Sequence, residues 1–160
     1  MRDYIEIEPR LMAYDPEDEM TPLHSLCSGI RAGWWIVPYE NSAQKGRILI
    51  ALGWDANTQT RSTRETACHV LLRCVIHDAI EQGHRWSRNE GFSLLRVLID
   101  AGADFSKKDC AGFSAARIVF NYTWRCNKAG FPLDITDKVR EKYPGEYAEW
   151  VILQDTEGTV

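Results

Sequence analysis

The feature that most constrains this chain is an internal repeat, in which the same short patterns return after 45 to 49 residues. A Thr-x-x-His segment begins at Thr21 and returns at Thr66, 45 residues later. Gly53, which follows an apolar run, has its counterpart 49 residues on at Gly102. A third copy begins near Ser114 and then diverges. We expect the copies to stack on one another, because no single copy can bury its own apolar face.

Each copy carries the signals of two helices. The threonines Thr21 and Thr66 suit an N-cap, since a hydroxyl there accepts a hydrogen bond from an otherwise unpaired backbone N–H. Apolar residues recur at helical spacing through 66–80 and 93–101. The two glycines stand just past such runs, where a left-handed C-cap favours glycine. The pattern predicts an all-α chain of about three helix–turn–helix copies.

Three segments carry a resemblance to a known family. TPLHSLC and LLRVLIDAGADFSKKDCAGFSAARI, with GRILIALGWDANTQT as a partial match, resemble the ankyrin repeat. The resemblance implies a solenoid of helix pairs joined by finger-like turns, with partners docking on the fingers and the inner helices. It also implies that each histidine ties its own helix start to the neighbouring turn. The residues expected to be structural for these reasons are Thr21, His24, Thr66, His69, Gly53 and Gly102.

The chain departs from the family pattern in length and in its third copy. An ankyrin repeat has about 33 residues, so each copy here holds a long insertion between its helices, at 29–44 and near 79–92. The third copy carries Arg117 in place of the histidine. The segment at about 132–154 is interpreted as a distorted outer helix followed by a capping helix.

These boundaries predict one repeat domain between two short ends. We expect an acidic N-terminal segment at 1–19, an ankyrin-like domain at 20–154 and a C-terminal tail at 155–160. Within the domain, the expected repeats lie near 20–64, 65–111 and 112–143, and the cap at 145–154.

Composition and charge narrow the class of protein. The 160 residues are 44% hydrophobic and 26% charged, as in soluble globular proteins. A net charge of −4 disfavours an overall basic nucleic-acid binder, and no apolar run is long enough to span a bilayer. The opening MRDYIEIEPR lacks the apolar core of a signal peptide. We therefore expect a cytoplasmic or nuclear protein without a membrane partner.

No motif in the chain predicts catalysis, a metal or a cofactor. The sequence contains no Gly-x-Ser-x-Gly elbow, phosphate loop or paired carboxylates. The five cysteines are an odd number without a Cys-x-x-Cys pair, which favours reduced thiols. Cys74 and His77 share a helical face, but the cysteine also fits the apolar stripe. We expect a non-enzymatic module that binds another protein. One alternative is an enzyme or ligand binder with a pocket formed by the long insertions.

Candidate partner-binding residues lie in the insertions and the finger turns. The aromatic run of the first insertion either covers the first repeat or binds a partner, because tryptophan and tyrosine dominate interface hot spots. A second alternative is a structural subunit that self-associates through this run. Basic residues in the turns could form an edge for an acidic partner, or be ordinary solvated residues. The candidates are Trp34, Trp35, Tyr39, Arg61, Arg64, Trp86, Lys107 and Lys108.

Overall fold

The computed structural model describes residues 17, 19–32, 41–77, 85–125 and 131–158. Within this part of the chain every regular element is a helix, apart from one isolated β-bridge between Lys108 and Ser114. This confirms the all-α prediction. The helices are α2 (Pro22–Ala32), α3 (Ser42–Ala51), α4 (Ala67–Val75), α5 (Arg85–Asp100), α6 (Ala115–Arg125), α7 (Leu133–Lys142) and α8 (Pro144–Gly158).

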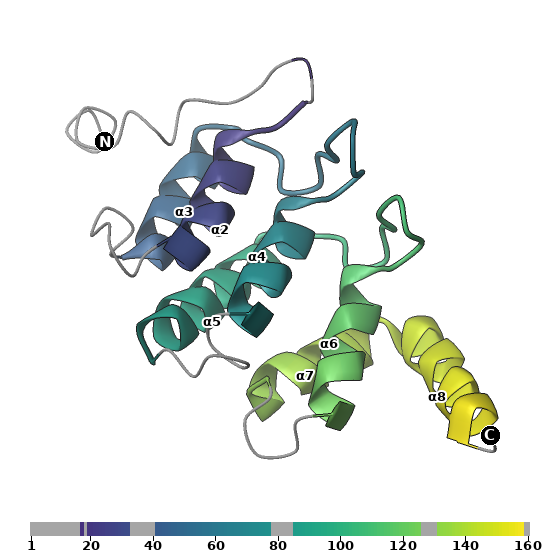
Figure 1. Cartoon of the computed structure of the whole chain (residues 1–160). Helices are drawn as coiled ribbons and strands as arrows, with labels where there is room; N and C mark the ends of the chain where they lie inside the picture. Colours follow the sequence, from purple (N-terminus) through teal and green to yellow (C-terminus); the bar gives the residue numbers. More distant parts are fainter. Residues whose placement is uncertain (1–16, 18, 33–40, 78–84, 126–130, 159–160) are drawn as a thin grey trace.

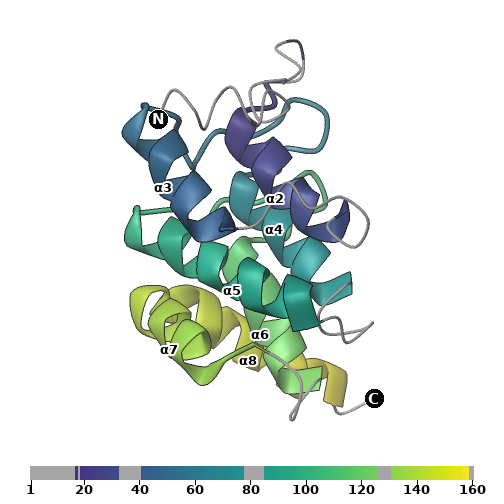
Figure 2. The same cartoon turned by 90° about the vertical axis from the view of Figure 1, so that its left-hand side faces the viewer.

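Consecutive helices form pairs, and the pairs stack in two layers (Figures 1 and 2). The inner layer contains α2, α4 and α6, and the outer layer contains α3, α5 and α7. Helix α2 packs on α4, α3 packs on α5, and α6 packs on both α4 and α7. Helix α8 follows the last pair and contacts α6 and α7. The turns at 53–65 and 102–113 project from one side of the stack, and we call them the first and second fingers.

The repeated polar residues shape the ends of the helices. Thr66 is the N-cap of α4, where its side chain accepts from the backbone N–H of His69, and the His69 ring accepts from the backbone of Thr66. The backbone N–H of Thr21 donates in the same way to Nδ1 of His24 at 3.1 Å. Past the outer helices, Gly53 has a φ of 101°, a left-handed conformation in which a side chain would be strained.

The core runs continuously through both layers. Gly46 allows α3 to approach α5 closely, because a Cβ at this position would lie 2.7 Å from the side chain of Leu94. Large side chains that are almost completely buried come from both layers and from the second finger. They are Leu23, Leu26, Leu49, Leu71, Leu72, Leu94, Leu95, Leu98, Phe105 and Phe120.

One predicted helix boundary is wrong. Helix α5 begins at Arg85 and not near residue 93, so much of the second insertion is helical. The reason is that Phe92 is buried against Phe131, with ring centroids 5.7 Å apart, which anchors the added turns. Helix α8 runs from Pro144 to Gly158, four residues past the cap expected at 145–154.

Candidate functional site

Each of the first two inner helices is joined to the next finger by a histidine. Nε2 of His24 lies 3.0 Å from the carbonyl oxygen of Glu65, and Nε2 of His69 lies 2.9 Å from that of Phe113. Because a carbonyl can only accept, Nε2 carries the proton, while Nδ1 accepts from the threonine backbone. Both rings are buried and hydrogen-bonded at both nitrogens. They hold the fingers in place.

The two fingers are also bonded directly to each other. The backbone N–H of Cys110 donates to the carbonyl of Thr63 at 2.9 Å. Nε2 of Gln59 donates to the carbonyls of Arg64 and Lys108, both at 2.9 Å. The two fingers therefore form one continuous edge.

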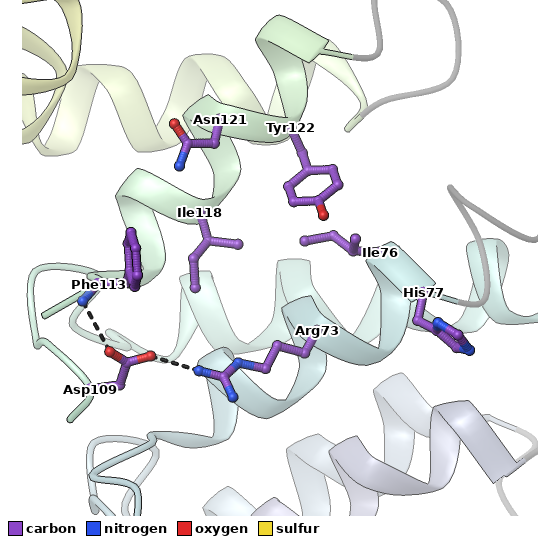
Figure 3. Close-up of a pocket in the computed structure, with 8 residues that line it drawn as sticks. All are labelled: Arg73, Ile76, His77, Asp109, Phe113, Ile118, Asn121 and Tyr122. Carbon is purple, nitrogen blue, oxygen red and sulfur yellow. Dashed lines mark hydrogen bonds and ion pairs between the residues drawn. The ribbon is translucent and has the colours of Figure 1, made fainter. Parts of the chain in front are cut away.

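A pocket of about 370 Å³ opens between α4 and α6, beside the second finger (Figure 3). Ile118 and Tyr122 point from α6 toward α4, where Ile76 lies opposite them. Phe113 stands at one end of the pocket, and 39% of its surface is exposed. The full lining is Arg73, Ile76, His77, Asp109, Phe113, Ile118, Asn121 and Tyr122.

Arg73 is fixed at the edge of this pocket by two carboxylates. Its guanidinium lies 2.6 Å from Glu65 and 2.7 Å from Asp109, while 52% of its side chain remains exposed. The carboxylate of Asp109 is fully buried and also accepts from the backbone N–H groups of Ala111 and Phe113, each at 3.0 Å. The pocket thus presents a positioned arginine beside an aromatic and aliphatic lining.

The structure brings only part of the predicted contact set together. The shared hydrogen bonds of Gln59 place the backbones of Arg64 and Lys108 next to each other on the finger edge, and both residues are exposed. Arg61 is also exposed and forms an ion pair with Glu19 at 3.1 Å. Lys107, partly buried, lies near Asp104, whose pKa is lowered mainly by a hydrogen bond from the Ser106 hydroxyl. Trp34, Trp35, Tyr39 and the side chain of Trp86 lie outside the described residues.

Sequence reasoning missed the residues that form the pocket. A signal was present in Arg73, which interrupts the apolar run of α4 with a charge. Another was Phe113, because the residue before the helix start is glutamate in the preceding copy and an exposed phenylalanine here.

The buried cysteines pack in the core, and their environment makes the thiols unreactive. Burial raises the pKa of Cys68 to about 12 and also raises that of Cys27, where Cys68 and Cys74 contribute further. Such thiols stay protonated, and it is the thiolate that attacks or ligates. Among the described residues, no group of three or more His, Cys, Asp or Glu side chains is placed to hold a metal ion.

Comparisons with known proteins do not assign the chain to a family. Comparison with protein-family models, curated proteins and solved structures found no match. In the described part of the chain, no helix is both long enough and apolar enough to cross a membrane.

Proposed function

We propose that this chain is a non-catalytic recognition module of the ankyrin-repeat type, which binds a protein partner through its fingers and inner helices in the cytoplasm or nucleus. The proposal is supported by the paired helices and by the histidine that joins each of the first two inner helices to the following finger. These features make the two successive units equivalent in geometry as well as in sequence.

The observation that carries the proposal is the pocket between α4 and α6. It combines a tyrosine and an arginine, which are residue types enriched in interface hot spots, with an exposed phenylalanine around a concave apolar floor. Carboxylates from both fingers already hold the arginine in position. A partner would therefore lose little entropy in ordering this group.

The finger edge extends the same surface. Because the fingers are bonded to each other and Lys108 adjoins Asp109 of the pocket, a partner that fills the pocket and also covers the finger edge would meet Arg64 and Lys108. These cations favour acidic groups on the part of the partner that crosses the edge, and such charges mainly raise the association rate.

The test is affinity capture followed by binding measurements with the purified partner. One variant carries Phe113→Ala and Tyr122→Ala in the pocket, and a second carries Arg64→Glu and Lys108→Glu on the finger edge. A matched control reverses two charges on the exposed outer helices, Arg47→Glu and Lys138→Glu.

We expect the native chain and the control to bind the same partner equally. The pocket variant should bind at least about tenfold more weakly, since hot-spot truncations cost about 2 kcal/mol or more. Circular dichroism on each variant separates lost binding from lost folding. Equal binding by all folded variants, or loss with the outer-helix control alone, would refute the proposal.

A further inference from the structure

The pocket between α4 and α6 is linked to the last helix by one hydrogen bond. Nε1 of Trp150 on α8 donates to Oδ1 of Asn121 on α6 at 2.7 Å. Asn121 belongs to the lining of the pocket, whereas Trp150 does not. Trp150 is buried and packs against Phe120 and Tyr147, with ring centroids 6.0 and 5.8 Å away. Helix α8 therefore fixes a side chain of a pocket that it does not itself line.

This hydrogen bond decides how the amide of Asn121 is oriented. Because an indole N–H can only donate, the atom that it meets must be the amide oxygen. Figure 3 shows the amide nitrogen, Nδ2, turned toward Ile118 and Phe113. Nδ2 has no acceptor among the described residues, and it is not completely buried, since Arg117 Nε is the one fully buried unpaired side-chain atom among them. Its N–H groups therefore remain available to a molecule in the pocket.

The other polar groups of the lining already interact within the chain. The carboxylate of Asp109 is fully buried and accepts from Arg73 and from two backbone N–H groups. Arg73 in turn pairs with two carboxylates. His77 and Tyr122 each interact with another group of the chain. Asn121 thus supplies the lining with a neutral donor whose nitrogen has no partner in the described part of the chain.

An unpaired neutral donor beside apolar side chains favours a ligand with a neutral acceptor. A purely apolar ligand would remove water from Nδ2 of Asn121 without replacing its hydrogen bond, which is unfavourable. A carboxylate would lose its own hydration, and the one lysine or arginine of the described lining, Arg73, is already paired. A peptide segment suits both parts of the lining, since each residue carries a carbonyl beside its side chain.

We propose that Asn121 is a specificity-determining residue of this pocket, whose Nδ2 donates to a backbone carbonyl of a partner segment that inserts an apolar side chain between Ile76 and Ile118. Trp150 is the positioning residue, because its indole orients the amide from outside the pocket. A donor that is already oriented loses little rotamer freedom when a partner binds. This inference rests on the function proposed above and adds the chemistry that the pocket recognises: an apolar residue with a neutral carbonyl.

The experiment is an NMR titration of the isotope-labelled chain with N-acetyl-leucine-N-methylamide, a neutral leucine unit with a carbonyl on each side. The side-chain amide signal of Asn121 is assigned by its absence from the variant Asn121→Asp. We expect saturable shifts of this signal and of the backbone signals of Phe113 and Ile118, with a dissociation constant of about 1 mM for a ligand of this size. N-acetyl-leucine, which carries a carboxylate in place of the methylamide, should bind several-fold more weakly.

Variants of the chain separate the two roles. Asn121→Asp keeps the size of the side chain and an acceptor for Trp150 but removes the donor, so it should bind the methylamide about fivefold more weakly. Trp150→Phe keeps an aromatic ring in the core and should weaken binding by a similar factor or less. Added to Asn121→Asp, it should cause no further loss, because Trp150 acts through Asn121. Arg47→Glu on the outer helix α3 is the control and should bind like the native chain.

Several outcomes would overturn this inference. These are the absence of saturable shifts in the native chain, tighter binding of N-acetyl-leucine than of the methylamide, and undiminished binding by the folded Asn121→Asp variant. An equal loss from Trp150→Phe in both backgrounds would show that Trp150 has a structural role alone. If Phe113→Ala with Tyr122→Ala abolishes capture of the partner while Asn121→Asp leaves methylamide binding unchanged, the proposed function stands and the role of Asn121 is wrong.

Discussion

The two junctions between helix pairs differ although the same repeat builds both. At the first, α2 and α3 pack on α4 and α5, and the space is filled by buried leucines and thiols such as Leu26 and Cys27. At the second, α6 packs on α4 but a pocket of about 370 Å³ separates part of their surfaces. Among the side chains that the structure describes, those of the first junction fill the core, and those of the second leave a pocket open to solvent.

Single positions within the repeat account for much of this difference. Counted from the helix start, Tyr122 of α6 stands where α4 has the buried Cys74. Phe113 of the second finger stands where the first has Glu65. Larger aromatic groups at equivalent positions line an open space instead of filling a closed one. The comparison teaches that a repeat can keep its backbone connections while side-chain size decides whether a junction is sealed.

The largest effect expected from this comparison is on stability. Leu26→Ala at the sealed junction should lower the free energy of unfolding by about 2–5 kcal/mol, because Leu26 is completely buried. Ile118→Ala should cost about 1 kcal/mol, since Ile118 already borders the open pocket. Urea unfolding followed by circular dichroism measures both. Equal losses would show that the two junctions are packed alike.

A second contrast concerns the residue three positions after each helix start. His24→Ala removes the three buried hydrogen bonds of the imidazole ring and should cost about 1–3 kcal/mol. The corresponding Arg117 has a buried Nε without a hydrogen-bond partner in the structure. Arg117→Met removes that donor and keeps the aliphatic stem, but it also removes the guanidinium from above the Phe113 ring, 5.2 Å away, so stability should change by no more than about 1 kcal/mol. Thermal unfolding of the two variants compares the two changes, and a marked loss in Arg117→Met would contradict this account.

The smallest effect expected is a pH dependence at the second junction. Arg96 of α5 donates to both carboxylate oxygens of Asp134 on α7, at 2.8 and 3.0 Å, and this lowers the pKa of Asp134. A lowered carboxyl pKa stabilises the fold above the ordinary aspartate value of about 3.9, and the contribution is lost as the pH falls through the lowered value. Both groups are substantially exposed, so the pair contributes at most about 1 kcal/mol.

The contribution of the Arg96–Asp134 pair to stability can be measured with the variant Asp134→Asn. The difference in urea midpoint between the native chain and the variant should be present at about pH 5 and shrink below about pH 3.5. A difference that stays constant over this range would mean that the ion pair does not couple α5 to α7.

The sequence predicted what depends on local backbone chemistry. Helix starts at Thr21 and Thr66 and the turn at Gly53 follow from capping and left-handed geometry, which a few neighbouring residues decide. The predicted start of α5 was wrong because the true start depends on the contact of Phe92 with Phe131, two residues from distant segments of the chain.

The pocket could not be predicted for the same reason. It requires Arg73 to meet Asp109, which lies 36 residues away, and Tyr122 to face Ile76 across two helices. Periodicity marks which face of a helix is apolar, but it does not say whether that face will be covered. The sequence predicted that the basic residues of the fingers are exposed. It could not predict that Arg64 and Lys108 lie next to each other, because this depends on the hydrogen bonds that Gln59 donates to both of their carbonyls.

The most direct test of the central claim is hydrogen–deuterium exchange of the native chain with and without its captured partner. We expect slower exchange on binding in the second finger at 102–113 and in the facing helices α4 and α6. The outer helices α3 and α5 should exchange at unchanged rates. Slower exchange confined to the outer layer, with the second finger and α6 unaffected, would contradict the assignment of the open junction as the recognition surface.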